Sequence, residues 1–259
     1  MLRRRVIVCL DVSLGRVVKG IGFRDLRDVG DPAELATRCE AEGADEVVFL
    51  DVSASVEGRR TLLDAVGRTA ERLSIPLTVG GGIASVADAR AILCAGADKI
   101  GVNSAAVARP ELLTELAALF GRQCVVASLD ARREADAAWR VYTHGGRRST
   151  GLEAVAWAAE CARRGAGEIL LTSIDRDGGR NGYDLALTRR VADAVGVPVI
   201  ASGGAGRAEH LVAAFQAGGA DAALVAGVFH EGVLSLGDIK QALAAAGLPV
   251  RRIEREVQA

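Results

Sequence analysis

The chain has 259 residues, of which 50% are hydrophobic and 25% charged, and its 32 basic and 33 acidic residues leave a net charge of -1. This balance excludes a general attraction to nucleic acid or to an anionic membrane surface, so a polyanionic ligand must be bound at a local site. No apolar run approaches the roughly 18 residues of a membrane span, and the length suits one large domain, 1–259, with a substantial core.

The chain opens with a basic segment and a short apolar run, MLRRRVIVCLDV. A signal peptide has the same order, but here the apolar part is only VIVCL and no small-residue cleavage site follows. We therefore predict a first strand over 6–11, ending on the carboxylate of Asp11. The same ending returns at Asp130 in CVVASLDA (124–131), and such a charge is either a solvated cap or part of a reaction site.

Short runs rich in Val, Ile and Leu recur along the chain and alternate with helix-like stretches. The runs are 6–11, 46–51, 76–81, 98–103, 124–130, 168–173, 198–204 and 221–227, and helical patterns include 32–43, 85–96, 110–121 and 153–165. The strands are too apolar to have a solvated face, which is typical of parallel strands covered by helices. Eight such units predict a (β/α)8 barrel; an open doubly wound sheet is the competing arrangement.

The chain also repeats itself at long range. GADEVVFLDVS (43–53) matches GAGEILLTSID (165–175) at an offset of 122, and VGGGI (79–83) matches ASGGA (201–205) at the same offset. This predicts a duplicated half-barrel, with halves of about 1–122 and 123–259. Asp11 and Asp130 then end opposite strands, and because barrel active sites lie at the carboxyl ends of the strands, catalysis is favoured over solvation.

Glycine-rich turns follow the third and seventh strands, VGGGI and ASGGAG. Glycines at a strand-to-helix turn let backbone amides approach an oxyanion, although tight turns use glycine as well. Asn103 and Ser104 add side-chain donors after the fourth strand, and AGVF follows the eighth. One anion pocket in each half predicts a long substrate that is phosphorylated at both ends.

Two long connections and one set of charges complete the pattern. The loop 13–32 has the length of a lid or a disordered segment, and Lys19 is its candidate phosphate ligand; 139–151 resembles a small polar hairpin. At the opposite ends of the strands, four charges stand at strand starts and are either solvated caps or an ion-paired ring: Arg5, Glu46, Lys99 and Glu168.

The cysteines and histidines show no metal-binding spacing. Five cysteines without a CxxC pair are expected to be small buried residues in a reducing cytoplasm, and three scattered histidines predict no zinc site.

A set of motifs runs in one order along essentially the whole chain: CLDV, GRVVKG, LRDVGDP, FLDVSAS, TVGGGI, GADKIGVNSAA, THGGR, GAGEILLTSIDRDG, GYD and IASGGAG. In this order the chain closely resembles the family of cyclase subunits of imidazole glycerol phosphate synthase, of histidine biosynthesis. The resemblance implies a cytoplasmic lyase without metal or cofactor, paired in a heterodimer with a glutamine amidotransferase subunit. Ammonia from that partner would cross the barrel and react with a bisphosphorylated formimino-carboxamide ribonucleotide (PRFAR). The products would be imidazole glycerol phosphate and the aminoimidazole carboxamide ribonucleotide AICAR.

The resemblance also implies roles for residues. It makes Asp11 and Asp130 the general acid/base pair, with Asp130 as acid in ammonia addition and Asp11 as base as the first assignment. Lys19 corresponds to the mobile substrate loop, and the four strand-start charges to a gate for ammonia. Phosphate binding is carried over to Gly81, Gly82, Asn103 and Ser104 on one side, and to Asp177, Gly178, Gly203 and Gly204 on the other.

Three positions depart from the family pattern, each by loss of a side-chain donor: Gly22 for Asn, Gly179 for Thr and Gly227 for Ser. They put substrate affinity in question more than activity. Two alternatives stay open: the sister isomerase of the same pathway, and a non-catalytic scaffold that activates the glutaminase. CLDV, SASVEGRR (53–60) and the gate charges favour the cyclase over the isomerase, and the two aspartates speak against a scaffold.

Overall fold

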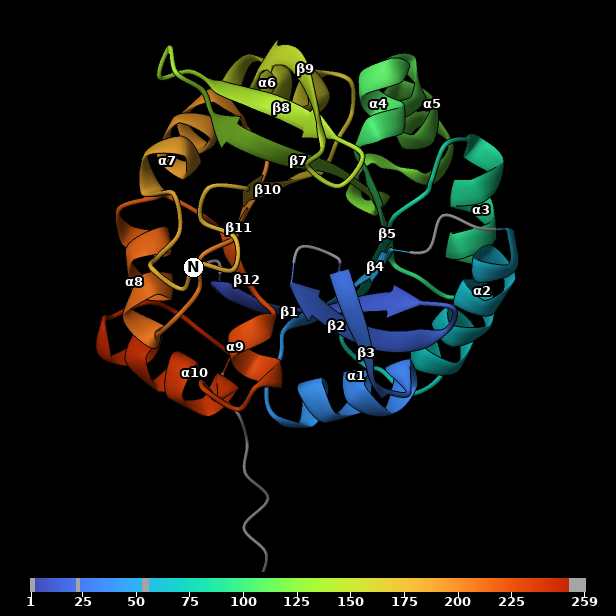
Figure 1. The fold of residues 1–259 in the computed structure, drawn as a ribbon, viewed down its shortest axis with the longest axis horizontal. Helices are drawn as coiled ribbons and strands as arrows, with labels where there is room; N and C mark the ends of the chain where they lie inside the picture. Colours follow the sequence, from blue (N-terminus) through green and yellow to red (C-terminus); the bar gives the residue numbers. More distant parts are fainter. Residues whose placement is uncertain (1–2, 22–23, 53–55, 252–259) are drawn as a thin grey trace, which may run out of the picture.

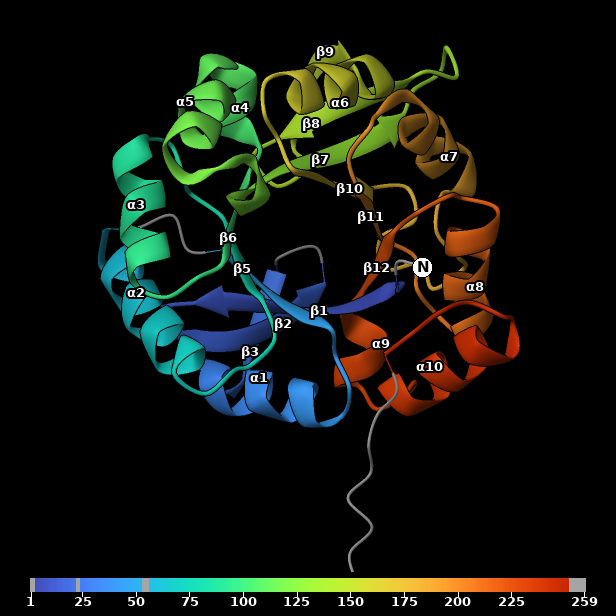
Figure 2. The ribbon, with the colours of Figure 1, turned by 180° about the vertical axis from the view of Figure 1, so that it is seen from behind.

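A computed structural model describes residues 3–21, 24–52 and 56–251 of the chain. Eight parallel strands form a closed ring with helices around it, as both faces of the molecule show (Figures 1 and 2). The barrel strands are β1 (Arg5–Ser13), β4 (Glu46–Asp51), β5 (Leu77–Gly80), β6 (Lys99–Val102), β7 (Val125–Arg133), β10 (Glu168–Ser173), β11 (Val199–Ser202) and β12 (Ala222–Val225). The predicted (β/α)8 barrel is confirmed, and the open sheet is excluded because the row of strands from β10 through β1 to β7 closes on itself: β10 pairs in parallel with β7 as well as with β11.

The helices lie outside the ring. They are α1 (Pro32–Ala41), α2 (Val56–Ala70), α3 (Val86–Cys94), α4 (Ser104–Ala108), α5 (Glu111–Phe120), α6 (Ala154–Arg163), α7 (Leu185–Ala194), α8 (Ala208–Gln216), α9 (Gly227–His230) and α10 (Leu236–Ala245), with a 3-10 turn, η1 (Arg122–Cys124). Side-chain caps set several of their starts: Asp31 accepts the Ala33 amide at α1, and Ser85 accepts the Asp88 amide at α3. The predicted division between half-barrels falls in η1 and stays a prediction.

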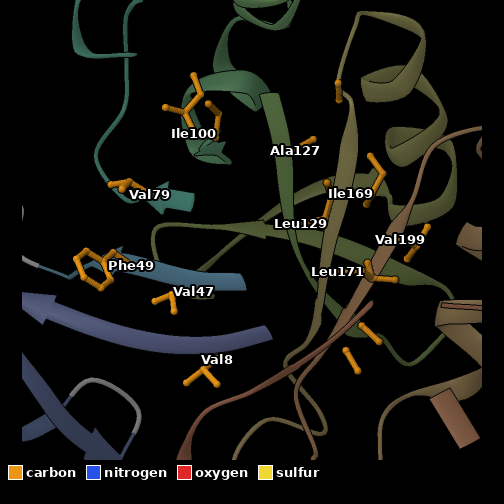
Figure 3. Packing of buried hydrophobic residues seen from close by; sticks show 14 of the residues in the cluster. Val8, Val47, Phe49, Val79, Ile100, Ala127, Leu129, Ile169, Leu171 and Val199 are labelled. Carbon is orange, nitrogen blue, oxygen red and sulfur yellow. The ribbon is translucent and has the colours of Figure 1, made fainter. Parts of the chain in front are cut away.

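Alternate residues of the strands belong to two separate apolar clusters. Val6, Val8 and Leu10 of β1 pack in the large cluster between strands and helices, part of which is drawn in Figure 3. Ile7 and Cys9 belong to a small cluster formed by residues of β1, β4, β7, β10, β11 and β12. Because strands from opposite sides of the ring meet in this small cluster, it lies in the barrel interior.

The two accessory segments are both hairpins. The loop 13–32, expected to be a lid or disordered, contains β2 (Arg16–Ile21) and β3 (Arg24–Gly30), and β2 pairs antiparallel with the end of β1 at Val12 and Ser13. The predicted hairpin at 139–151 is confirmed as β8 (Trp139–Thr143) and β9 (Arg148–Glu153).

The triplet Gly-Ala-Asp occurs before three barrel strands, at 43–45, 96–98 and 219–221, and its aspartate has a structural role. In each of them the aspartate carboxylate accepts the backbone N–H at the start of a neighbouring strand: Asp45 from Val6, Asp98 from Leu77, and Asp221 from Val199. Asp45 also binds Lys240 of α10 at 2.7 Å and Arg251 at 2.9 Å. In the fourth copy, GAGE, Gly167 replaces the aspartate, because a Cβ there would collide with the carbonyl oxygen of Arg122.

The prediction for the cysteines holds only in part. Cys9, Cys39 and Cys161 are buried, but Cys94 is exposed and Cys124 is intermediate. Cys94 lies on the face of α3 opposite the buried Ala89 and Ile92, which the cysteine count could not reveal. Within the described ranges, no cluster of three metal-ligating side chains occurs, and no helix is both long and apolar enough to span a bilayer.

Candidate active site

Two carboxyl groups lie at the carboxyl ends of opposite barrel strands, Asp11 on β1 and Asp130 on β7. In the closed sheet these strands are four places apart in either direction. Asp11 follows the inward Ile7 and Cys9 at intervals of two, so it shares their direction toward the axis, and Asp130 follows Val126 in the same way. The two side chains therefore face each other across one mouth of the barrel.

The pKa values of both carboxyl groups lie above the ordinary value of an aspartate. Burial, and secondarily the charge of Asp177, raises the pKa of Asp11 to about 6. The same causes, in the same order, raise the pKa of Asp130 to about 6, opposed by a hydrogen bond from Asn103. A carboxyl group with a pKa near neutral can both give and take a proton in one reaction cycle.

Asp177 is a third acid of this mouth, in the turn that follows β10. Desolvation raises the pKa of Asp177, although the residue is solvent-exposed, and the Gly178 amide partly opposes the shift. Its charge acts on both Asp11 and Asp130. The family resemblance implies phosphate binding at this position, and the structure adds this electrostatic link to the paired acids.

Asn103 is positioned beside Asp130. Its side-chain amide donates to the Asp130 carboxylate at 3.0 Å and to the Tyr142 carbonyl oxygen at 3.4 Å, while its own Oδ1 is buried and has no hydrogen-bond partner among the described residues. An unpaired buried acceptor is costly and is a place for a ligand donor. The side chain thus contacts an acid, which its expected role as a phosphate donor did not foresee.

Neutral replacement of Asp11 is expected to stabilise the fold in a pH-dependent way. The pKa of Asp11 in the folded state lies above the ordinary value of 3.8, so ionisation of this buried group destabilises the fold. The protein therefore has its full stability at low pH and loses part of it as the pH rises through about 6. Asp11→Asn should therefore raise the free energy of unfolding by about 1–3 kcal/mol at pH 7 and by much less at pH 4. Urea titrations at both pH values measure this, with the exposed Asp193→Asn as control; an equal gain at both pH values would contradict it.

The predicted phosphate loops adopt backbone conformations that require glycine. Gly81 has φ of 99° and Gly204 has φ of 104°, and a Cβ at either position would collide with a neighbouring carbonyl oxygen, of Asp51 or Gly182. Gly82, Gly178 and Gly203 also have positive φ. Ser104, at the start of α4, accepts the His144 amide at 3.1 Å and can still donate its own hydroxyl hydrogen.

Lys19 lies on the β2 strand, and its side chain reaches the segment that follows the neighbouring barrel strand β12. Its ammonium group pairs with Glu231, which follows α9, and lies 3.5 Å from the Gly227 carbonyl oxygen. Arg180, in the loop after β10, binds the same Glu231 carboxylate. No sequence pattern indicated Glu231, because its two partners are far away along the chain.

The four strand-start charges form an ion-paired ring at the other end of the barrel. Arg5 lies 3.0 Å from Glu46 and 2.9 Å from Glu168, and Lys99 lies 2.9 Å and 3.0 Å from the same two carboxylates. Glu46 is only 1% exposed and also accepts the Thr78 hydroxyl at 2.6 Å. Thr78 was missed in the sequence, where a single polar residue inside the apolar run PLTVGG was its only signal. From Arg5 to Asp11 the path along β1 is about 20 Å.

The three glycines that depart from the family pattern, Gly22, Gly179 and Gly227, differ in their surroundings. A Cβ on Gly227 would have no atom of the described residues within 4 Å, whereas one on Gly179 would lie 3.1 Å from the Arg176 carbonyl oxygen. Gly22 lies outside the described residues, as do the first residues of SASVEGRR (53–55).

Comparison with known proteins gives one consistent result. A family model described as "Histidine biosynthesis protein" matches residues 5–235. The imidazole glycerol phosphate synthase subunit HisF of Myxococcus xanthus is 66% identical over 98% of this chain and all of its own length. Proteins of the same name from Anoxybacillus flavithermus and Geobacillus kaustophilus are 59% and 58% identical over 97% of this chain and all of theirs.

Proposed function

The chain belongs to the histidine biosynthesis protein family, and from this premise we propose that it works as the cyclase subunit of imidazole glycerol phosphate synthase with Asp11 and Asp130 as its acid–base pair. The identity of about 60% over the full length of three relatives with that name carries the assignment of the enzyme. The enzyme uses ammonia to convert PRFAR into imidazole glycerol phosphate and AICAR. The opposed acids are the observation that supports the residue roles.

The chemistry needs protons delivered and removed at several steps. Addition of ammonia to the open-chain ketose gives a carbinolamine, and imine formation expels its hydroxyl group as water, which requires an acid. Cleavage of the C–N bond to AICAR and closure of the imidazole ring then move further protons in both directions. Two carboxyl groups with a pKa of about 6 on opposite sides of the substrate suit this exchange, since each can act as acid and then as base.

The glycine-rich turns at Gly81–Gly82 and at Gly203–Gly204 each form one rim of the mouth. Together the two rims support a substrate that spans the mouth. One phosphate would lie against Gly81, Gly82 and the start of α4, and the other against Gly178, Gly203 and Gly204. The reacting part of PRFAR would then lie between Asp11 and Asp130, near the buried Asn103 side-chain oxygen.

The subunit name of the relatives implies a synthase complex with a glutamine amidotransferase subunit. We place that partner at the ion-paired ring, on the face opposite the acids, so that ammonia enters the barrel through the ring. Transfer through the barrel interior protects ammonia from protonation and loss to solvent.

Incubation of the purified chain with PRFAR and an ammonium salt tests the function. The cyclase releases AICAR without any partner protein. A sister isomerase or a non-catalytic scaffold would release none, and that result would overturn the proposal.

Lys99→Met is expected to reduce glutamine-dependent AICAR formation severalfold more than ammonia-dependent formation. The substitution breaks two ion pairs of the ring, with Glu46 and Glu168, and leaves the distant mouth unchanged. Both assays are run on the complex with the glutaminase partner, and the ratio of the two rates is the measured quantity. An equal loss in both assays would remove the ring from ammonia transfer.

A further inference from the structure

Three segments that are far apart in sequence meet at Glu231. Its carboxylate pairs with Lys19 of the β2–β3 hairpin and with Arg180 of the loop that follows β10. Glu231 itself follows the short helix α9, after the last barrel strand. One acidic side chain thus connects the hairpin to two loops of the C-terminal half.

The ion pairs of Glu231 with Lys19 and Arg180 form a bridge. This bridge lies at the rim of the Gly203–Gly204 turn, where the second phosphate is expected. Lys19 Nζ is 3.5 Å from the carbonyl oxygen of Gly227, the first residue of α9. Arg180 belongs to the turn that also carries Asp177 and Gly178. Lys19 and Arg180, two cations of this rim, are therefore engaged by a carboxylate of the protein.

The charges of the three side chains favour this arrangement. The hydrogen bonds from Lys19 and then Arg180 lower the pKa of Glu231, so its carboxylate is ionised at neutral pH. Gly179 and Gly227, the two nearby positions that depart from the family pattern, carry no side-chain donor groups. Two cations without a counter-ion would repel each other, and Glu231 removes this repulsion.

We propose that Glu231 is an affinity-determining residue, whose carboxylate takes the place of a substrate phosphate at Lys19 and Arg180 and must be exchanged for it when the substrate binds. The exchange is feasible because the bridge is open to water: the side chains of Lys19, Arg180 and Glu231 are 31%, 44% and 37% exposed. Partly exposed ion pairs are weak, whereas a phosphate with two charges binds a lysine–arginine pair more strongly.

Substitution of Glu231 by glutamine tests the exchange. Glu231→Gln should lower both the KM for PRFAR and the inhibition constant of inorganic phosphate by about fivefold, the upper range for one such ion pair. Both constants are measured at fixed ionic strength with ammonium chloride as the nitrogen source. Glu231→Asp keeps the carboxylate and should restore values close to those of the wild type.

Two further variants separate the exchange from a general charge effect. Glu209→Gln removes one exposed negative charge from the first turn of α8, beyond the Gly203–Gly204 turn, and should change neither constant. In a chain that already carries Arg180→Gln, Glu231→Gln should lower the KM for PRFAR and the inhibition constant of phosphate by a smaller factor than it does in the wild type. An unchanged or higher KM in Glu231→Gln, or a change confined to kcat, would overturn the proposal and make the bridge a purely structural clamp.

This inference rests on the proposed phosphate site, and the wild-type assay keeps the two apart. If the wild-type chain does not turn over PRFAR, the proposed function fails. If the wild type is active and Glu231→Gln lowers neither constant, only the exchange fails.

Discussion

Asp11→Asn and Asp130→Asn are each expected to lower ammonia-dependent AICAR release from PRFAR by about 10²- to 10⁴-fold, the usual contribution of a general acid–base residue. The amide has nearly the same shape but cannot donate or accept a proton at the required steps. The loss should appear in kcat, because neither carboxylate belongs to the glycine-rich phosphate rims. Circular dichroism and binding of inorganic phosphate should stay close to those of the wild type.

The pair also offers an internal control. Asn103→Ala removes the hydrogen bond to Asp130 but leaves both acids in place, so its loss of turnover should be smaller than that of Asp130→Asn. Asp193→Asn, on the outside of α7, should keep full activity. Normal turnover in either active-site variant would exclude that aspartate from the mechanism.

Asp45→Ala is expected to lower the free energy of unfolding by about 3–5 kcal/mol, which is the cost of leaving a buried charge without its partner. Asp45 is 8% exposed and binds Lys240, which is 5% exposed, as well as Arg251 and the Val6 amide. Burial lowers the pKa of Lys240, and the hydrogen bond to Asp45 opposes this shift. Without Asp45 the ammonium group loses its compensation inside the contact between α10 and the barrel.

Asp98→Ala is the matched control, because Asp98 has the same place in a GAD triplet and accepts the Leu77 amide. We expect it to cost only about 1 kcal/mol, the net value of one hydrogen bond. Adding Lys240→Met to Asp45→Ala should recover part of the loss, because an apolar side chain needs no counter-ion. Urea unfolding followed by circular dichroism measures all three variants, and equal losses for Asp45→Ala and Asp98→Ala would contradict the account.

The barrel could be predicted from the sequence because its strands are apolar on both faces. Ile7 and Cys9 fill the interior while Val6 and Val8 pack outward, so the run VIVCL has no polar side. The hairpin at 16–30 was missed, because its charged residues are typical of a loop. Its pairing depends on β1, which extends past the barrel to Ser13 and offers an edge that local sequence does not show.

The site could be predicted as a set of positions but not as a set of contacts. The repeat placed Asp11 and Asp130 on opposite strands, and the strand starts marked Arg5 and Lys99. The acceptor of the Asn103 side-chain amide could not be predicted from the sequence. Asp130 is 27 positions away, and the two residues come together only because β6 and β7 are adjacent strands. Contacts of this range depend on how the ring closes.

A structure of the Asp130→Asn variant with PRFAR bound tests the central claim most directly. We expect one phosphate at the Gly81–Gly82 turn, the other at the Gly203–Gly204 turn, and the scissile C–N bond between the side chains of residues 11 and 130. A ligand that occupies only one rim, or that leaves Asp11 out of hydrogen-bonding reach, would contradict it.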